Sequence, residues 1–400
     1  MKKFAKSFTQ QETIPEQGIA QAIEVMRSGR LHRYSTLAGE ASETDLLEQE
    51  FAERMGSRYC LACTSGGYAL QIALRSVGVR AGDKVLCNGF TLAPVPGAIY
   101  SIGAETILVE TTKDCVIDLQ DLTAKAQASK ARYLLLSHMR GHIVDMDSLV
   151  AICKQFDLCL IEDCAHTMGA RWKGQRSGSF GTVSCFSTQT YKHLNSGEGG
   201  LLVTDDDAVM ARSVVHSGSY MLFDRHLAAP PPVVYDEIRY NTPNCSGRMD
   251  NLRAAVLRPQ LAELEQQCVR WNERYAVLEQ GLRMLPSVRL PRRPAEEYFI
   301  GSSIQFALPG WSAEKIGQFV AGCGDRGVEL KWFGADQPQG YTSRYDSWRY
   351  LGSPQPLPRT KKLLATLLDM RVPLTFDLDD CRLITTLIGE VLIEVEKAAA

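Results

Sequence analysis

Long apolar runs are missing from this 400-residue sequence. None approaches the roughly 20 residues that a membrane-spanning helix needs, so we expect no contact with a membrane. The 44 basic and 46 acidic residues nearly cancel, and a net charge of −2 provides no attraction for nucleic acid. The polar residues that follow Met1 lack the apolar stretch of a signal peptide. We therefore predict a cytoplasmic protein that binds neither membranes nor nucleic acid.

Metal-binding patterns are also scarce, although the sequence contains 12 cysteines. Most of them stand singly in apolar runs, where free cysteine behaves as a small buried hydrophobe. Cys60 and Cys63 have CxxC spacing, but they fall in a predicted strand and no second pair lies at zinc-site distance. We therefore predict buried thiols and no metal site.

Short apolar runs alternate with helical patterns along the first half of the chain. The runs are expected to be strands at 59–63, 85–87, 106–109, 133–136, 158–161 and 200–203. Strands separated by helices predict a mainly parallel sheet between two layers of helices, a three-layer α/β/α domain. The 45% hydrophobic composition is sufficient for this large domain and a smaller one.

A long helical pattern at about 250–282 divides the chain. We predict that it joins a large domain, residues 1–265, to a smaller C-terminal α/β domain, residues 266–400, with strands at 303–307 and 328–332. Before the helix, residues 218–247 contain three consecutive prolines and little periodicity. A long irregular segment of this kind indicates an active-site or subunit-contact loop, with a plain surface insertion as the alternative.

Reactive side chains follow two of the apolar runs. Asp163 comes directly after the run that ends at Ile161, and Lys192 lies in a turn-rich segment after the run that Ser187 closes. Ligand sites of open α/β sheets lie at such strand ends. An acidic residue and a lysine are also the pair with which proteins bind pyridoxal phosphate (PLP). The alternatives are a helix cap for Asp163, a surface lysine for Lys192 and a locally bonded serine for Ser187.

A turn of small residues, Ser65, Gly66 and Gly67, separates the first predicted strand from the helix that follows it. This arrangement gathers backbone N–H groups for a phosphate at a helix N-terminus. Glycine-rich turns are common in α/β proteins, so the turn carries weight only together with the other motifs.

These motifs together resemble the DegT/DnrJ/EryC1/StrS sugar aminotransferases, which are fold-type-I PLP enzymes. The resemblance rests on the segments 162–166, 178–181 and 185–187, on Lys192 and on Gly197–Gly200, and it extends in order over most of the chain. It implies an aspartate-aminotransferase-like fold, PLP as the cofactor, and a homodimer with shared active sites.

The resemblance also implies roles for individual residues. Lys192 would form the Schiff base with the cofactor and then act as general base and acid. Asp163 would keep the pyridine nitrogen protonated, and Ser187 would donate to the phosphate together with the turn of small residues. His166 stands where the family usually has glutamine, and would bond the ring hydroxyl or pack on the ring.

Three features depart from the family pattern. Gly67 replaces a threonine, and Leu92 occupies the position of an aromatic residue that stacks on the cofactor ring, unless Phe90 takes that role. The family also has a short Asn-x-Arg motif whose asparagine reaches the partner subunit's cofactor. In this chain the loop before Arg248 has two extra residues, so Asn244 is the candidate for that asparagine and Asn241 is the alternative. Because all three features surround the site, we expect an acceptor unlike the family's commonest nucleotide sugars.

The activity that the resemblance implies is transfer of an amino group from an amino acid, glutamate or glutamine, to a keto-sugar, cyclitol or related carbonyl compound. One related branch replaces the lysine with histidine and dehydrates sugars, but here His193 is only adjacent to Lys192. A PLP-dependent sugar dehydratase is therefore the second hypothesis. A PLP-binding regulatory protein without turnover is the third.

Overall fold

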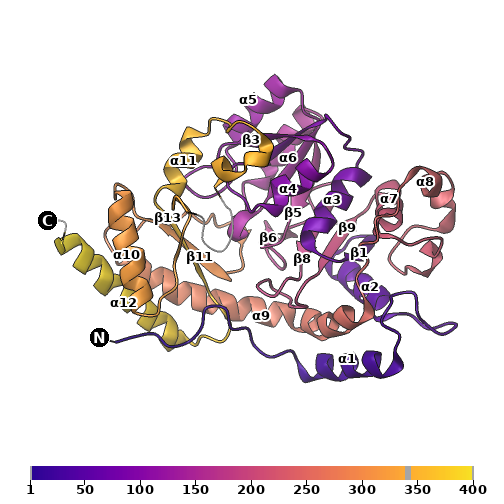
Figure 1. The fold of residues 1–400 in the computed structure, drawn as a ribbon, viewed down its shortest axis with the longest axis horizontal. Helices are drawn as coiled ribbons and strands as arrows, with labels where there is room; N and C mark the ends of the chain where they lie inside the picture. Colours follow the sequence, from indigo (N-terminus) through magenta and orange to yellow (C-terminus); the bar gives the residue numbers. More distant parts are fainter. Residues whose placement is uncertain (1, 338–343, 399–400) are drawn as a thin grey trace.

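A seven-stranded sheet forms the centre of the larger part of the molecule in the computed structural model, which describes residues 2–337 and 344–398 (Figure 1). Across the sheet, the strands are β1 (Tyr59–Cys63), β9 (Gly200–Thr204), β8 (Val183–Ser187), β5 (Cys159–Asp163), β4 (Tyr133–Ser137), β2 (Lys84–Asn88) and β3 (Glu105–Val109). Neighbours from β8 to β3 pair in parallel, whereas β9 runs antiparallel to both β8 and β1. The predicted mainly parallel sheet is confirmed.

Helices cover both faces of this sheet. One face packs in a common core with α2 (Glu43–Met55), α5 (Leu119–Ser129), α6 (Met146–Gln155) and the first part of α9 (Asn251–Arg283). The other packs against α3 (Gly66–Ser76), α4 (Pro94–Ser101), α7 (Asp207–Ser217) and α8 (Tyr235–Asn241). Because both faces are covered, every residue of β1, β4, β8 and β9 is buried. The three-layer α/β/α architecture is therefore also confirmed.

A second, three-stranded antiparallel sheet lies in the C-terminal part. Its order is β11 (Ser303–Ala307), β13 (Leu367–Arg371) and β12 (Lys331–Trp332), and α10 (Ala313–Asp325) and α12 (Leu378–Ala398) share its core. The expected strand 328–332 is reduced to its last two residues, because only these pair with β13. The central strand β13 was not predicted, because its short run directly follows the helix α11 (Pro358–Leu364).

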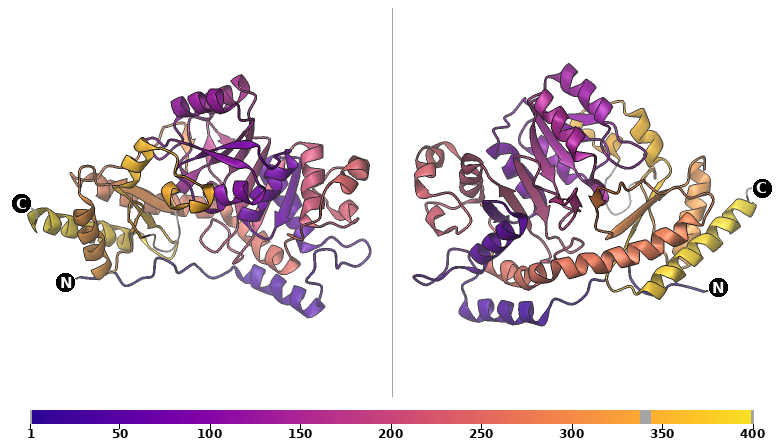
Figure 2. Two further views of the ribbon diagram at one scale, coloured as in Figure 1. Left: turned by 45° about the horizontal axis from the view of Figure 1, so that its top comes forward. Right: turned by 180° about the vertical axis from the view of Figure 1, so that it is seen from behind.

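The helix α9 runs from the large part of the molecule into the small one (Figure 2). Beside it lies the N-terminal segment, in which α1 (Glu16–Ser28) packs on α9. Further toward the N-terminus, Phe4 and Phe8 pack edge-on against Phe376, in the core of the small part. The N-terminal segment thus contacts both parts of the molecule. The predicted domain boundary at residue 265 stays a prediction.

The segment 218–247 is more regular than its sequence indicates. It contains the short 3-10 turns η2 (Phe223–Arg225) and η3 (Pro232–Val234), followed by α8. The rings of Phe223 and Tyr235 stack with centroids 4.3 Å apart, and Tyr235 is fully buried. These two anchors attach the segment to the large part.

Two further pieces complete the chain. A small sheet joins β10 (Glu297–Tyr298), β6 (Arg171–Trp172) and β7 (Gln175–Arg176), and three-residue 3-10 turns lie at η1 (Met139–Gly141), η4 (Tyr345–Ser347) and η5 (Arg349–Leu351). Among the helices of residues 2–337 and 344–398, none combines the length and the apolar character that a membrane crossing requires.

Candidate active site

Lys192 lies in the loop between β8 and β9. Its amine contacts the ring of His166, which follows the end of β5. Lys192 Nζ lies 2.8 Å from His166 Nε2, and the imidazole is buried. Burial of the amine, together with the positive charges of Arg140 and Arg371, lowers the pKa of Lys192 to about 7. Burial and the charge of Lys192 also hold the pKa of His166 well below its ordinary value, so the ring beside the amine is neutral. A lysine whose pKa is lowered in this way is more easily neutral than an ordinary lysine, as a nucleophilic amine must be.

Asp163 ends β5 and belongs to a buried hydrogen-bond chain across three strand ends. Ser137 Oγ donates to Asp163 Oδ2 at 2.8 Å, and Thr91 Oγ1 donates to Ser137 Oγ at 2.8 Å. Asn88 Nδ2 holds the same strand end by donating to the carbonyl of Ser137 at 2.7 Å. Because residues 164–170 form turns, Asp163 does not cap a helix. Its carboxylate is a fixed anion at the carboxyl edge of the sheet.

Ser65, Gly66 and Ser187 lie together at the N-terminus of α3. The side chain of Ser65 caps this helix by accepting from the backbone N–H of Tyr68. A Cβ atom on Gly66 would lie 2.8 Å from the Cβ of Ser187, so only glycine allows this approach. At Gly67 a Cβ would meet Pro94 at an ordinary 3.5 Å, so the site does not require glycine there. Backbone N–H groups and a serine hydroxyl at a helix N-terminus suit a phosphate group.

Phe90 and Leu92 differ in their surroundings. Phe90 is fully buried, and its ring packs edge-on against Phe333 with centroids 5.0 Å apart. Leu92 is half-buried beside the same apolar cluster. Phe90 is thus a core residue between the two parts of the molecule. Leu92 stays the predicted contact of the cofactor ring.

Neither candidate asparagine reaches the site within one chain. Asn241 donates to the carbonyl of Glu237 inside α8. Asn244 is exposed and accepts from the backbone N–H of Ser246 at 3.1 Å. The loop nevertheless adjoins the phosphate turn, since Thr64 N–H donates to the carbonyl of Gly247 at 3.0 Å. The role of Asn244 toward a partner subunit stays a prediction.

His193 is turned toward the small part of the molecule. Its Nε2 lies 3.1 Å from Ser302 Oγ, and its ring packs edge-on against Trp271. Burial, followed by the charge of Lys192, lowers the pKa of His193 to about 3, so the ring is neutral. A cavity of about 570 Å³ between the N-terminal segment and α9 touches both His193 and Lys192. These contacts make His193 a packing residue and do not support the histidine-based dehydratase hypothesis.

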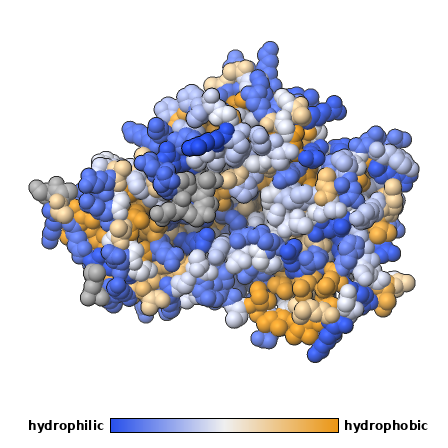
Figure 3. Space-filling model, viewed as in Figure 1, coloured by the Kyte–Doolittle hydropathy of each residue, from blue (hydrophilic) through white to orange (hydrophobic). Residues whose placement is uncertain are grey.

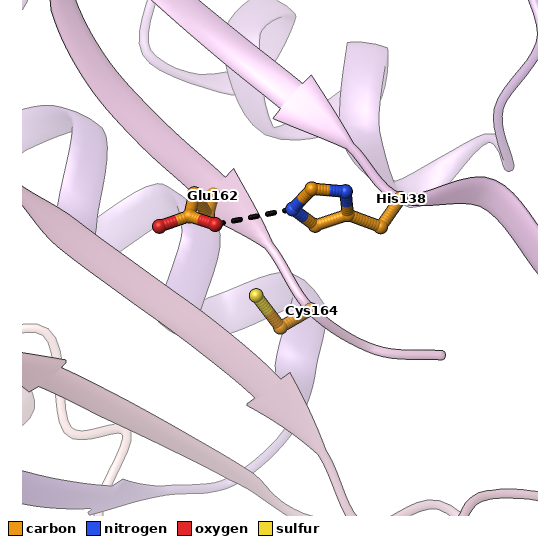
Figure 4. Close-up of side chains that lie close together, drawn as sticks. All are labelled: His138, Glu162 and Cys164. Atoms are coloured by element: carbon orange, nitrogen blue, oxygen red, sulfur yellow. Dashed lines mark hydrogen bonds and ion pairs between the residues drawn. The ribbon is translucent and has the colours of Figure 1, made fainter. Parts of the chain in front are cut away.

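A buried group of His138, Glu162 and Cys164 resembles a set of metal ligands (Figure 4). The carboxylate of Glu162, however, already accepts bonds from His138 Nε2, from the hydroxyl of Ser184 and from three backbone N–H groups of residues 178–181. Burial raises the pKa of Glu162, but these bonds outweigh it and leave the pKa below its ordinary value. Hydrogen bonding explains the group without a metal, and its role is to position the loop beside β5.

Sequence reasoning missed the polar residues that orient Asp163. Asn88 and Ser137 each end a buried strand, so the rule that identified Asp163 could also have identified them. Thr91 could be identified only from the structure, because its contact with Ser137 joins the loop after β2 to the end of β4.

An amine of lowered pKa, a strand-end carboxylate and a helix N-terminal turn that suits a phosphate are together typical of a PLP enzyme. Comparison with known proteins leads to the same class of enzyme. The model of the DegT/DnrJ/EryC1/StrS aminotransferase family matches residues 13–364, so the chain belongs to this family. It is accordingly a PLP-dependent aminotransferase.

Two curated relatives illustrate the range of the family. One is 3-amino-5-hydroxybenzoate synthase of Amycolatopsis mediterranei, 30% identical over 294 residues, which are 72% of this chain and 71% of that protein. Another is L-glutamine:2-deoxy-scyllo-inosose aminotransferase of Streptoalloteichus tenebrarius, 32% identical over 298 residues, 72% of this chain and 68% of that protein. A solved structure of 3-amino-5-hydroxybenzoic acid synthase covers 98% of this chain and is itself covered completely, with a TM-score of 0.83 and 23% identity. This structural similarity supports the fold described above.

Proposed function

We propose that the enzyme transfers the amino group of glutamine to a ring ketone of a cyclitol or keto-sugar in a biosynthetic pathway. The observation that carries this proposal is the 2.8 Å contact of Lys192 Nζ with His166 Nε2, near the strand end where Ser137 holds the carboxylate of Asp163. Glutamine and cyclitol ketones are suggested by relatives that are named L-glutamine:2-deoxy-scyllo-inosose and L-glutamine:scyllo-inosose aminotransferases.

Each side chain of the site has its own proposed role toward the cofactor or the substrate. When bound, PLP supplies an aldehyde for amines and a ring that stabilises negative charge on the adjoining carbon. Ser65, Gly66 and Ser187 would hold its phosphate, and Asp163 would face its ring nitrogen. Lys192 Nζ, whose pKa is lowered well below that of an ordinary lysine, would accept a proton from the substrate carbon and later return it. His166 Nε2 keeps this amine oriented through the 2.8 Å contact.

The enzyme is further proposed to be a cytoplasmic homodimer with shared active sites. All twelve cysteines are free thiols, as is usual in a reducing compartment. Exposed apolar side chains on α1, namely Ile19, Ile23 and Met26, form a patch that suits a second subunit (Figure 3). The exposed Asn244 would then be available to the partner's cofactor.

Absorbance of the holoenzyme tests the proposed reaction. Addition of glutamine should remove the near-visible absorbance band of the lysine-bound cofactor, and scyllo-inosose or a related ketone should restore it. A band that no amino acid changes would overturn the proposal in favour of a PLP-binding protein without turnover. Release of water from the acceptor with no amine in the product would favour the dehydratase.

A further inference from the structure

The N-terminal segment runs along α9 (Figure 1), and a cavity of about 570 Å³ lies between the two. This volume falls within the roughly 300–1,000 Å³ of small-molecule sites. Lys192 borders the cavity, so a molecule bound there lies next to the proposed catalytic amine. The described residues of the lining include four side-chain amides and three carboxylates, but no arginine. The cavity therefore suits a polar molecule that carries no negative charge.

Two amides of the lining are fixed through their oxygens. Asn195 Oδ1 accepts from the backbone N–H of Gly197 at 3.0 Å, and Gln267 Oε1 accepts from Arg270 Nη1 at 2.7 Å. Gln260 also holds the backbone of Asn195, because it accepts from its N–H and donates to its carbonyl, both at 2.9 Å. In the part of the chain that the structure describes, the NH₂ groups of Asn195 and Gln267 have no protein acceptor. Each can therefore donate to an oxygen atom of a bound molecule.

Two buried rings form part of the wall of the cavity. The indole N–H of Trp271 donates to the carbonyl of Val372 at 3.1 Å, so the ring contributes apolar surface. His193 is only 5% exposed, and its Nε2 lies 3.1 Å from Ser302 Oγ. Its Nδ1 is buried and has no hydrogen-bond partner among the described residues. Because buried polar atoms normally have a partner, this nitrogen points to one from outside the chain.

Negative charge surrounds the mouth of the cavity. Glu16 and Glu263 are exposed and border it, and within residues 2–337 and 344–398 neither belongs to an ion pair. Glu12, by contrast, is paired with Arg270, with 2.6 Å between Oε1 and Nη2. Like charges that meet at a binding surface are unfavourable, so a phosphate or carboxylate group on the ligand is disfavoured. Hydroxyl groups, however, can donate to both free carboxylates.

We propose that this cavity binds the amino acceptor, and that the acceptor is an uncharged, polyhydroxylated ketone. Asn195 and Gln267 donate to its hydroxyl groups, whereas Glu16 and Glu263 accept from others. The ketone then lies toward Lys192, at the border of the cavity. The assignment rests on the proposed function, and it narrows the acceptor to compounds without a phosphate group.

The acceptor half-reaction tests the two amides, since it restores the absorbance of the lysine-bound cofactor from its amine form. Gln267→Met and Asn195→Ala should each raise the half-saturating concentration of scyllo-inosose by about 5- to 50-fold, because a hydrogen bond to a hydroxyl group is lost. Cyclohexanone, a ketone without hydroxyl groups, should change by less than about twofold, and so should glutamine in the donor half-reaction. Gln266→Met, at an exposed residue of α9 outside the lining, is the matched control and should change none of these values.

Competition by ligands that do not react tests the charge of the mouth. In the wild type, myo-inositol should compete with scyllo-inosose at a lower concentration than myo-inositol 1-phosphate. Glu263→Lys should reduce this preference by at least about threefold, because it replaces a repulsive charge with an attractive one. Glu273→Lys, at an exposed residue of the same helix outside the lining, is the control and should retain the preference.

Three results would overturn the assignment. Equal losses for scyllo-inosose and cyclohexanone would show that the amides only stabilise the lysine loop, and unchanged values for both ketones would exclude the amides from the site. A preference for myo-inositol that survives in Glu263→Lys would refute the exclusion of phosphate.

Failure of the proposed transamination has a different signature, because glutamine would then leave the absorbance of the wild-type holoenzyme unchanged. Calorimetry with myo-inositol tests the cavity in that case, since binding requires no turnover. Binding that Gln267→Met weakens would support the site, and absence of binding to the wild type would overturn it.

Discussion

At the residue scale, Lys192 Nζ has two proposed roles, because one amine would both bind the cofactor and move the proton. Its contact with the neutral ring of His166 orients the amine without adding positive charge. Loss of a general acid–base group of this kind costs about 100- to 10,000-fold in rate. We expect Lys192→Ala to lower transamination by at least the smaller of these factors.

Borohydride reduction followed by peptide mass spectrometry checks this prediction directly. The wild type should carry a pyridoxyl adduct on the peptide that contains Lys192, and the variant should carry none there. Lys154→Ala, which removes an exposed lysine of α6, is the control and should retain both adduct and rate. An active Lys192→Ala enzyme would contradict the assignment.

The pKa of about 7, far below the ordinary 10.5, predicts a pH dependence. Capture of the cofactor requires the neutral amine, so the capture rate of the apoprotein should rise through pH 7 and level off above about pH 8. An ordinary lysine would continue to gain toward pH 10. Stopped-flow absorbance measures the capture rate, and a rate still rising tenfold per pH unit above pH 8 would show that the amine is unperturbed.

The same pKa shift links pH to folding. The unfolded lysine has the higher pKa, so between about pH 7 and pH 10 the unfolded chain binds more protons than the native one. The free energy of unfolding of the apoprotein should therefore rise with pH across this window. Lys192→Met should lack this contribution. Urea titrations at pH 7 and pH 9 give the difference, and parallel behaviour of both proteins would contradict it.

At the scale of elements, strand ends determine what the sequence could predict. Asp163, Ser187 and Lys192 follow or close short apolar runs, so local pattern was enough to place them near one sheet edge. The N-terminal turn at Ser65–Gly67 was found in the same way. The structure brings Gly66 against Ser187, as a shared phosphate site requires.

Long-range pairing explains what the sequence could not predict. The strand β13 has no alternation that separates it from the preceding helix, and its position depends on pairing with β11. Arg371, whose charge contributes to the lowered pKa of Lys192, was therefore not recognised as part of the site. The helix α8 was missed for a related reason, since the burial of Tyr235 depends on stacking with Phe223.

The close approach of α3 to β8 allows a test of the phosphate turn. In Gly66→Ala the new methyl group would meet the Cβ of Ser187 at 2.8 Å, and overpacking of this kind costs about 1–3 kcal/mol. Because the strain falls on the turn, we expect weaker cofactor binding together with a lower melting temperature. Fluorescence titration of the apoprotein with PLP measures the affinity.

Gly97→Ala is the matched control for this substitution. Gly97 lies inside α4, and a Cβ there would meet no atom within 4 Å. It should leave PLP affinity unchanged and stabilise the helix by up to about 1 kcal/mol. Equal PLP affinities for Gly66→Ala and the wild type would show that the turn does not contact the cofactor.

On the scale of the whole molecule, α1 differs from a usual amphipathic surface helix, because it buries small residues and exposes large apolar ones. Its small residues Gly18 and Ala22 are buried, and a Cβ on Gly18 would lie 3.3 Å from the carbonyl of Val256 in α9. The large apolar residues Ile19, Ile23 and Met26 are instead 36–54% exposed (Figure 3). A helix that buries its small residues and exposes its large apolar ones is suited to a second partner.

We therefore expect Ile23→Glu to weaken the proposed homodimer. A buried charge at a subunit interface is unfavourable, so light scattering should give the mass of one chain at concentrations where the wild type gives two. Activity should fall with dimer content, because the proposed shared site would take Asn244 from the partner subunit. Ile393→Glu, at an apolar residue of α12 that is 50% exposed, introduces the same charge away from α1 and should remain dimeric and active. A dimer that persists in Ile23→Glu would exclude α1 from the interface, and a fully active single chain would refute shared active sites.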